Sequence, residues 1–253
     1  MKKLVFAILL VTGCISSYAQ KQKINYLTTF DDKLIHFGFT IGVNTLDFNI
    51  ANYNPIGENT AFLYDSKYPE VTQDKAIRSD VSTLIPGFTV GIISSLRLSK
   101  DFNLRFLPGL SFGERQITFN VPVYDINHPV LDESLRNYSI KSTFLDFPLL
   151  IKYKARRINN DRPYVIFGGA YRQDISRTAQ EDLIKLKSGG FYAEAGGGWD
   201  HYFPFFRFSV EAKFSFGLNN QLGDLPGGQQ RLYYAQSIKN LRSKIFTLCF
   251  HFE

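Results

Sequence analysis

The sequence predicts an all-β protein, an eight-stranded antiparallel up-and-down transmembrane β-barrel with four long extracellular loops and short periplasmic turns. Three observations predict it. Apolar and polar residues alternate with a period of two in eight segments, and the connections between these segments alternate between short and long. The composition combines 15% aromatic with 21% charged residues, and only the first twenty residues hold a long apolar run.

The eight alternating segments have two very different faces. One face is apolar over about ten residues, the length that crosses a bilayer at a tilt. The other face mixes Gly and Ser with charges of both signs, as the narrow interior of an eight-stranded barrel requires. The segments are residues 35–44, 88–98, 103–116, 143–153, 163–171, 191–200, 206–218 and 244–253, of which 163–171 alternates least clearly.

Aromatic residues gather where the segments end, as in the girdle at the membrane interface of outer-membrane barrels. We expect Tyr153, Trp199, Tyr202 and Phe205 in this girdle. A soluble β-sandwich would also alternate. The girdle and the length of the apolar faces therefore favour the membrane barrel.

The connections fix the orientation of the predicted barrel. Short connections lie near residues 99–101, 154–161 and 201–204, and long ones at about 51–80, 120–138, 172–187 and 219–241. The short side of an outer-membrane barrel is periplasmic. We therefore expect both chain ends on the periplasmic side and the protein in the cell outer membrane.

Residues 1–19 read as a signal peptide, with Lys2 and Lys3 before an apolar stretch and a small-residue cleavage site that ends at Ala19. The motif "VTGC" also resembles a lipoprotein box, in which Cys14 would be acylated instead. Cleavage after Ala19 would leave Cys249 as the only cysteine, so no internal disulfide could form. Residues 20–33 would then be a short periplasmic lead-in to the barrel at 34–253.

Charges and motifs point away from several function classes. The formal charge of +6 is scattered, with its densest patch at residues 154–159, so nucleic acid is not an expected partner. Zinc-protease and P-loop motifs are absent from the sequence, and its one match to the nucleophile-elbow pattern, residues 109–113, lies inside an alternating segment rather than between a strand and a helix. We therefore expect no enzyme, no cofactor, no bound metal and no small-molecule substrate, with an enzyme acting on lipid or peptide near the rim as the weaker alternative.

Charged residues on the polar faces are predicted to pair across a closed interior, because an unpaired charge out of water is costly and eight strands leave no wide channel. A conduction path or a catalytic carboxylate pair are the alternatives. The residues are Arg97, Arg105, Arg115, Lys141, Asp146, Lys152, Glu194, Glu211 and Lys213.

Two histidines are predicted to meet at the seam of the barrel. The last strand of a closed barrel pairs with the first, and His36 and His251 both lie on polar faces near the periplasmic ends. Zinc requires three or four ligands, and only Cys249 and Glu253 are nearby candidates. We therefore expect a packed polar pair that helps to fix the seam rather than a metal site.

Several stretches resemble the PorT/SprT proteins of Bacteroidetes: "YLTTFDDKLIHFGFTIGVNTLDF" (26–48), "FLDFPLLIKYKARRINNDRPYVIFGG" (144–169), "FYAEAGGGWDHYFPFFRFSVEAKFSFGL" (191–218) and the final "FHFE". The resemblance implies an outer-membrane β-barrel of the type IX secretion system, needed for export of proteins with a conserved C-terminal signal domain and for gliding in motile species. It implies no catalytic residues.

The resemblance further implies that other secretion components, in the outer membrane or the periplasm, are partners, beside the outer-membrane lipid. The expected contact surface is the loop at 51–80, with Tyr53, Phe62, Tyr64 and Tyr68, although an ordinary self-packed loop fits equally well. The alternative function is a generic small barrel, a weak porin or an adhesin, without a secretion role.

Overall fold

The computed structural model describes residues 24–64, 72–120, 137–176, 184–223 and 233–253. The signal peptide predicted at residues 1–19, with Cys14, lies outside the described residues. The strands are β1 (Ile35–Asn52), β2 (Ser79–Arg97), β3 (Phe102–Phe106), β4 (Gly109–Phe119), β5 (Asn137–Lys154), β6 (Asp161–Asp174), β7 (Gly189–Tyr202), β8 (Arg207–Gly217) and β9 (Ile238–Phe252). Three short helical turns are η1 (Phe30–Asp32), η2 (Ile56–Glu58) and α2 (Tyr233–Gln236).

The strands form one closed antiparallel ring, because β1 pairs with β2 on one side and with β9 on the other. β3 and β4 both lie between β2 and β5 and together make one strand, which is interrupted at Leu107 and Pro108. Pro108 has no N–H to give to a ladder. The ring therefore has eight members, as predicted, and no helix of the described residues has the length and apolar content to span a membrane.

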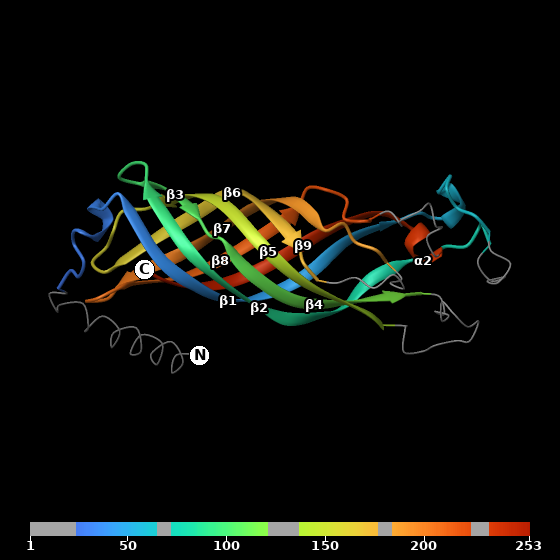
Figure 1. The fold of residues 1–253 in the computed structure, drawn as a ribbon, viewed down its shortest axis with the longest axis horizontal. Helices are drawn as coiled ribbons and strands as arrows, with labels where there is room; N and C mark the ends of the chain where they lie inside the picture. The colour runs from blue at the N-terminus through green and yellow to red at the C-terminus, as the bar shows by residue number, and fades with distance from the viewer. Residues whose placement is uncertain (1–23, 65–71, 121–136, 177–183, 224–232) are drawn as a thin grey trace, which may run out of the picture.

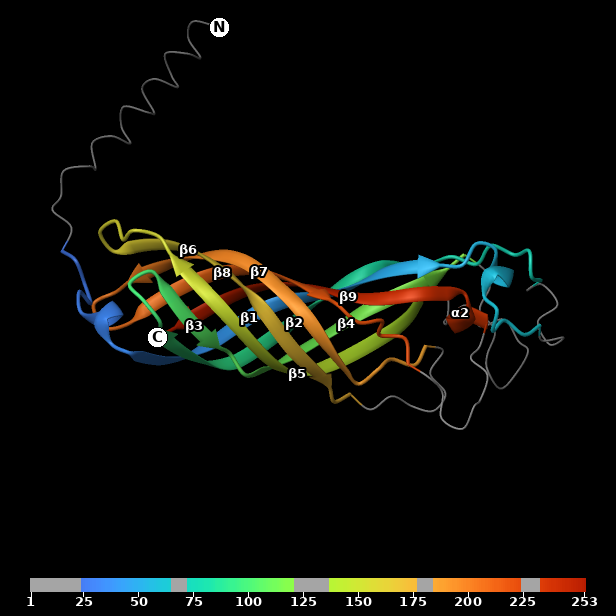
Figure 2. The same cartoon turned by 90° about the horizontal axis from the view of Figure 1, so that it is seen from above.

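The strand ends joined by the short turns lie at one end of the barrel, and the strand ends joined by the long connections lie at the other (Figure 1). η1 and the C-terminus share the end with the short turns, whereas η2 and α2 lie at the opposite end. Figure 2 shows the same separation from above. The predicted up-and-down topology is confirmed, with the short and the long connections at opposite ends of the barrel.

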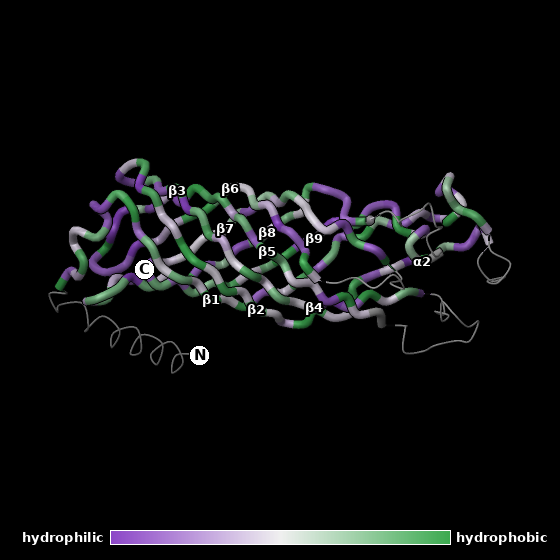
Figure 3. Tube along the Cα trace, in the orientation of Figure 1, coloured by the Kyte–Doolittle hydropathy of each residue, from purple (hydrophilic) through white to green (hydrophobic). Residues whose placement is uncertain are grey.

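An apolar belt covers the outside of the barrel. Phe37, Phe88, Phe167 and Phe214 are among the exposed aromatic residues of this belt, and their chain neighbours face inward. In Figure 3 the tube alternates between apolar and polar colours along the strands. The period-two prediction therefore holds, including the segment at 163–171, where Val165 and Phe167 both face outward.

Several strands are longer than the ten residues predicted, since β1 has 18, β2 has 19 and β5 has 18. The extra residues lie at the extracellular end. Their outer face is polar: Asp47 of β1 forms an ion pair with Lys244 of β9 at 3.8 Å, and Glu114 of β4 lies opposite Lys141 of β5. These strand ends therefore extend beyond the apolar belt.

The extracellular end of the interior is filled by an apolar cluster. It combines strand residues with residues of three of the long connections. Its members are Phe48, Ile56, Phe62, Ile77, Ile117, Phe119, Ile140, Ile184, Leu222, Ile238 and Leu241. The described parts of these three connections thus pack against inward-facing residues of the strands.

Candidate functional site: the barrel interior and its periplasmic mouth

The middle of the barrel holds a buried carboxylate, Glu211 of β8. Arg105 donates to Glu211 Oε2 at 2.7 Å and the Tyr164 hydroxyl donates to the same oxygen at 2.9 Å. His251 Nε2 lies 3.4 Å from it. Arg105 and Glu211 are 0% and 1% exposed, so the pair is out of contact with solvent.

A second ion pair lies nearer the periplasm. Lys152 of β5 donates to both carboxylate oxygens of Asp200 at 2.7 Å, and the Ser209 hydroxyl donates to one of them at 2.6 Å. The Lys152 ammonium also lies 3.6 Å from the centre of the Tyr164 ring. Lys152 and Asp200 therefore satisfy each other inside the wall of the barrel.

A third group lies toward the extracellular side and joins four charges. Glu194 accepts from Arg172 at 2.6 Å and lies 2.9 Å from the Lys213 ammonium. Arg172 also lies 3.4 Å from Asp146, which accepts a short hydrogen bond from Ser111. Two cations and two carboxylates thus balance.

Three predicted interior cations have other surroundings. Arg115 is buried and forms no ion pair with the other described residues, and its guanidinium lies 3.6 Å from the centre of the Phe48 ring. Arg97 lies at the periplasmic rim, 3.5 Å from Asp32. Lys141 was expected in the interior and lies on the outer face, since it has the same parity as the outward Phe147 of β5.

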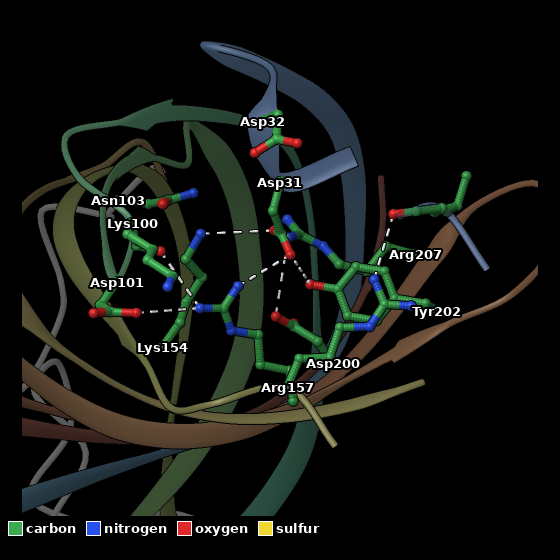
Figure 4. Close-up of polar contacts among 12 residues, drawn as sticks. Asp31, Asp32, Lys100, Asp101, Asn103, Lys154, Arg157, Asp200, Tyr202 and Arg207 are labelled. Atoms are coloured by element: carbon green, nitrogen blue, oxygen red, sulfur yellow. Dashed lines mark hydrogen bonds and ion pairs between the residues drawn. The ribbon is translucent and has the colours of Figure 1, made fainter. Parts of the chain in front are cut away.

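The periplasmic mouth is closed by Asp31 of η1 (Figure 4). Tyr202 donates to Asp31 at 2.6 Å, and Arg162, Arg207 and Lys154 lie 3.0, 3.4 and 3.6 Å from its carboxylate. Burial alone would raise the pKa of Asp31, but the Tyr202 hydrogen bond and these cations outweigh burial and lower the pKa to about 2. The ionised Asp31 carboxylate therefore occupies a pocket lined by cationic side chains.

The pocket is continued by the last residue of the chain. Arg207 of β8 lies 2.5 Å from the Glu253 carboxylate, and the two residues also exchange backbone hydrogen bonds. Phe30 stacks on His36 at 4.2 Å between ring centres and lies under the Arg207 guanidinium at 4.8 Å. The segment before β1 and the end of β9 thus meet at one mouth.

The predicted contact between His36 and His251 is wrong. Both side chains are buried, but His251 lies opposite Thr40 in the register of β1 and β9. His251 is therefore offset from His36 by four residue positions of β1, which is about 13 Å along the strand. The stagger that tilts the strands of a barrel causes this offset. The described residues contain no group of three or more His, Cys, Asp or Glu arranged to hold a metal ion.

Three of the four expected girdle residues are exposed near the periplasmic ends, namely Tyr153, Trp199 and Phe205. Tyr202 was expected beside them, and the structure places it inside the barrel, where it is 0% exposed and binds Asp31. Its parity matches Asp200 rather than Trp199, which explains the inward orientation.

The expected contact loop is in part self-packed. Phe62 belongs to the apolar cluster, and the centre of the Tyr53 ring lies 5.8 Å from the Lys239 ammonium. Tyr64 is exposed, whereas Tyr68 lies outside the described residues. Of the three described residues, Tyr64 has the side chain most available to a partner.

The sequence analysis did not predict the contacts that Asp31 makes at the periplasmic mouth. Arg207 and Lys154 were not among the predicted interior cations, although both follow the inward parity of their strands, which is the signal that could have found them. Nothing in the local sequence indicated that Asp31 folds back over them, because the contacts join residues more than a hundred positions apart.

A closed eight-stranded ring with an apolar belt and a polar, paired interior defines an outer-membrane β-barrel. The chain belongs to the family of the outer membrane protein beta-barrel domain, whose model matches residues 18–223. The protein is located in the cell outer membrane. A search of curated proteins gives no match.

Solved structures with some likeness include OprG from Pseudomonas aeruginosa, with 9% identity, 87% of this chain and 91% of that chain covered, and a TM-score of 0.39. Neisserial surface protein A has 10% identity, coverage of 87% and 98%, and a TM-score of 0.38. Ail of Yersinia pestis has 11% identity, coverage of 87% and 98%, and a TM-score of 0.33. At TM-scores this low, the likenesses support no conclusion about this chain.

Proposed function

We propose that this barrel is a non-conducting, non-catalytic component of the type IX secretion system, similar to PorT, which supports export of proteins with a conserved C-terminal signal domain by binding other secretion components. One observation carries the choice of binding over conduction. From Asp31 at the periplasmic mouth, three groups of ion pairs and then the apolar cluster follow one another along the described interior.

The secretion role itself rests on the resemblance of residues 26–48, 144–169 and 191–218 to PorT/SprT proteins. A barrel without a conduction path can act on other proteins at its two ends. The periplasmic mouth and the exposed part of the loop at 51–80, including Tyr64, are the surfaces available for such contacts.

The alternative is a generic small barrel, a weak porin or an adhesin. The strand ends that extend beyond the apolar belt would give an adhesin an extracellular surface. Both readings share the fold, so they are separated by what the cell loses without the protein.

The test is deletion of the gene, followed by mass spectrometry of the culture medium for secreted proteins with the conserved C-terminal signal domain. We expect these proteins to disappear from the medium and to accumulate in the periplasm, and the wild-type gene supplied in trans to restore them. Normal secretion in the deletion strain would exclude the proposed role and leave the generic barrel.

A further inference from the structure

We propose that the periplasmic mouth is a carboxylate-binding pocket for an acidic segment of a periplasmic protein, and that Asp31 occupies this pocket in cis. The inference rests on the proposed binding role, because it names the kind of partner that the mouth would accept. It concerns the pocket formed by Lys154, Arg162, Tyr202 and Arg207.

The pocket is built by the barrel without help from the lead-in. Its four side chains come from β5, β6, β7 and β8, and two of them have anchors of their own. Arg207 is held by Glu253 at 2.5 Å, and Arg162 donates to the Ala155 carbonyl at 2.7 Å. A pocket whose donors are already oriented binds a carboxylate at a lower entropic cost.

The charges at the mouth leave room for one carboxylate. Glu253 neutralises Arg207, and Asp101 lies 3.5 Å from Arg162 at the rim. Lys154 is buried, and its ion pair is with Asp31 at 3.6 Å. Removal of Asp31 would leave a buried ammonium without a direct ion pair among the described residues, which is unfavourable unless another carboxylate replaces Asp31.

The segment that supplies Asp31 is held by side-chain contacts and single hydrogen bonds rather than by strand pairing. Residues 24–34 contribute no strand to the ring, and Asp31 lies in a turn of three residues. Ile24 and Leu34 are 71% and 65% exposed. Release of the segment would therefore break side-chain contacts and single hydrogen bonds but no strand pairing.

The contacts of the segment define the chemistry of the ligand. The carboxylate fills the cationic pocket, while the preceding aromatic ring of Phe30 lies between His36 and Arg207. An aromatic residue followed by an aspartate in a flexible protein segment satisfies both features. A phosphate from a lipid headgroup would satisfy only the charges.

The test uses the full mature chain with Asp31→Asn, purified in detergent, and a fluorescent peptide with the sequence of residues 24–33. The matched control peptide carries Asn in place of the aspartate that corresponds to Asp31. The fluorescence anisotropy of each labelled peptide is measured as the variant chain is added. We expect the dissociation constant of the variant for the acidic peptide to be at least tenfold lower than its dissociation constant for the control peptide. The wild-type chain should bind the acidic peptide more weakly than the variant, because its own Asp31 competes.

Equal binding of the two peptides to the variant would overturn the proposal. Displacement of the peptide by short-chain phosphatidylglycerol, but not by an unlabelled acidic peptide, would assign the pocket to a lipid headgroup and also overturn it. If Asp31→Asn does not fold, excess acidic peptide added to the wild-type chain must displace the lead-in. Spin labels at Ile24→Cys and Lys100→Cys, in a background with Cys249→Ser, would report this displacement as a broadened distance distribution.

This experiment and the secretion test can fail separately. Loss of secretion in the deletion strain without peptide binding would retain the secretion role and reject the pocket. Peptide binding with normal secretion would retain the pocket and reject the role.

Discussion

Replacement of Glu211 by Gln removes the central charge of the barrel interior and keeps the shape of the side chain. Arg105 would then be a fully buried cation whose nearest carboxylate has been neutralised. Removal of one partner from a buried ion pair typically costs about 3 to 5 kcal/mol. The reason is that the remaining charge is neither hydrated nor paired.

The distance in the structure supports this magnitude. At 2.7 Å and an effective dielectric constant of about 20, the attraction between two unit charges is about 6 kcal/mol. Gln can still accept a hydrogen bond from Arg105 and from Tyr164, which recovers part of this attraction. We therefore expect the free energy of unfolding to fall by about 3 kcal/mol.

The assay is equilibrium unfolding in urea of the mature chain in lipid vesicles, followed by the fluorescence of Trp199. Trp199 is the only tryptophan and is half exposed on the outer face, so it reports whether the barrel is inserted in lipid. The control is Glu58→Gln, an exposed side chain of the turn η2, which should change stability by less than about 0.5 kcal/mol.

A loss below about 1 kcal/mol for Glu211→Gln would refute the reasoning. A second variant separates charge from packing. The double variant Arg105→Met with Glu211→Gln removes both charges and should be more stable than Glu211→Gln alone, because no unpaired cation remains.

Three further predictions follow from single features. At Gly38 a Cβ would lie 2.2 Å from the Phe252 carbonyl oxygen, so Gly38→Ala should slow closure of the seam in a gel-shift folding assay; Gly169→Ala, with its nearest neighbour at 3.6 Å, should fold normally. Because docking lowers the pKa of Asp31, docking of the lead-in is stabilised by about 2 kcal/mol above pH 4, and this stabilisation is lost as the pH falls toward 2. Spin-label distances between the lead-in and the barrel that stay unchanged down to pH 2 would contradict this prediction. Phe62→Ala should weaken the apolar cluster by about 3 kcal/mol and speed tryptic cleavage within residues 51–80, and unchanged cleavage would show that the loop does not depend on Phe62.

The strands and their faces could be predicted because a strand has a period of two. Once Phe214 and Phe216 are placed in lipid, Lys213 and Ser215 must face the interior. The same parity contradicts the two misplaced residues. Lys141 shares the outward parity of Phe147, and Tyr202 shares the inward parity of Asp200, so the strand period predicts the face of both residues better than the residue type does.

Partners across the barrel could not be predicted, because they depend on the stagger of strands that are distant in sequence. The expectation that His36 meets His251 counted both from the periplasmic end, but the register places His251 opposite Thr40. The docking of Asp31 on Tyr202 joins residues 171 positions apart. No local pattern encodes such a contact.

The most direct test of the central claim is the conductance of the purified mature chain in a planar lipid bilayer. A barrel whose described interior holds paired charges and an apolar cluster should insert without opening a stable channel. Insertion is verified separately by Trp199 fluorescence in vesicles of the same lipid. Reproducible conductance steps of one size from the inserted wild-type chain would contradict the claim that this barrel works by binding rather than by conduction.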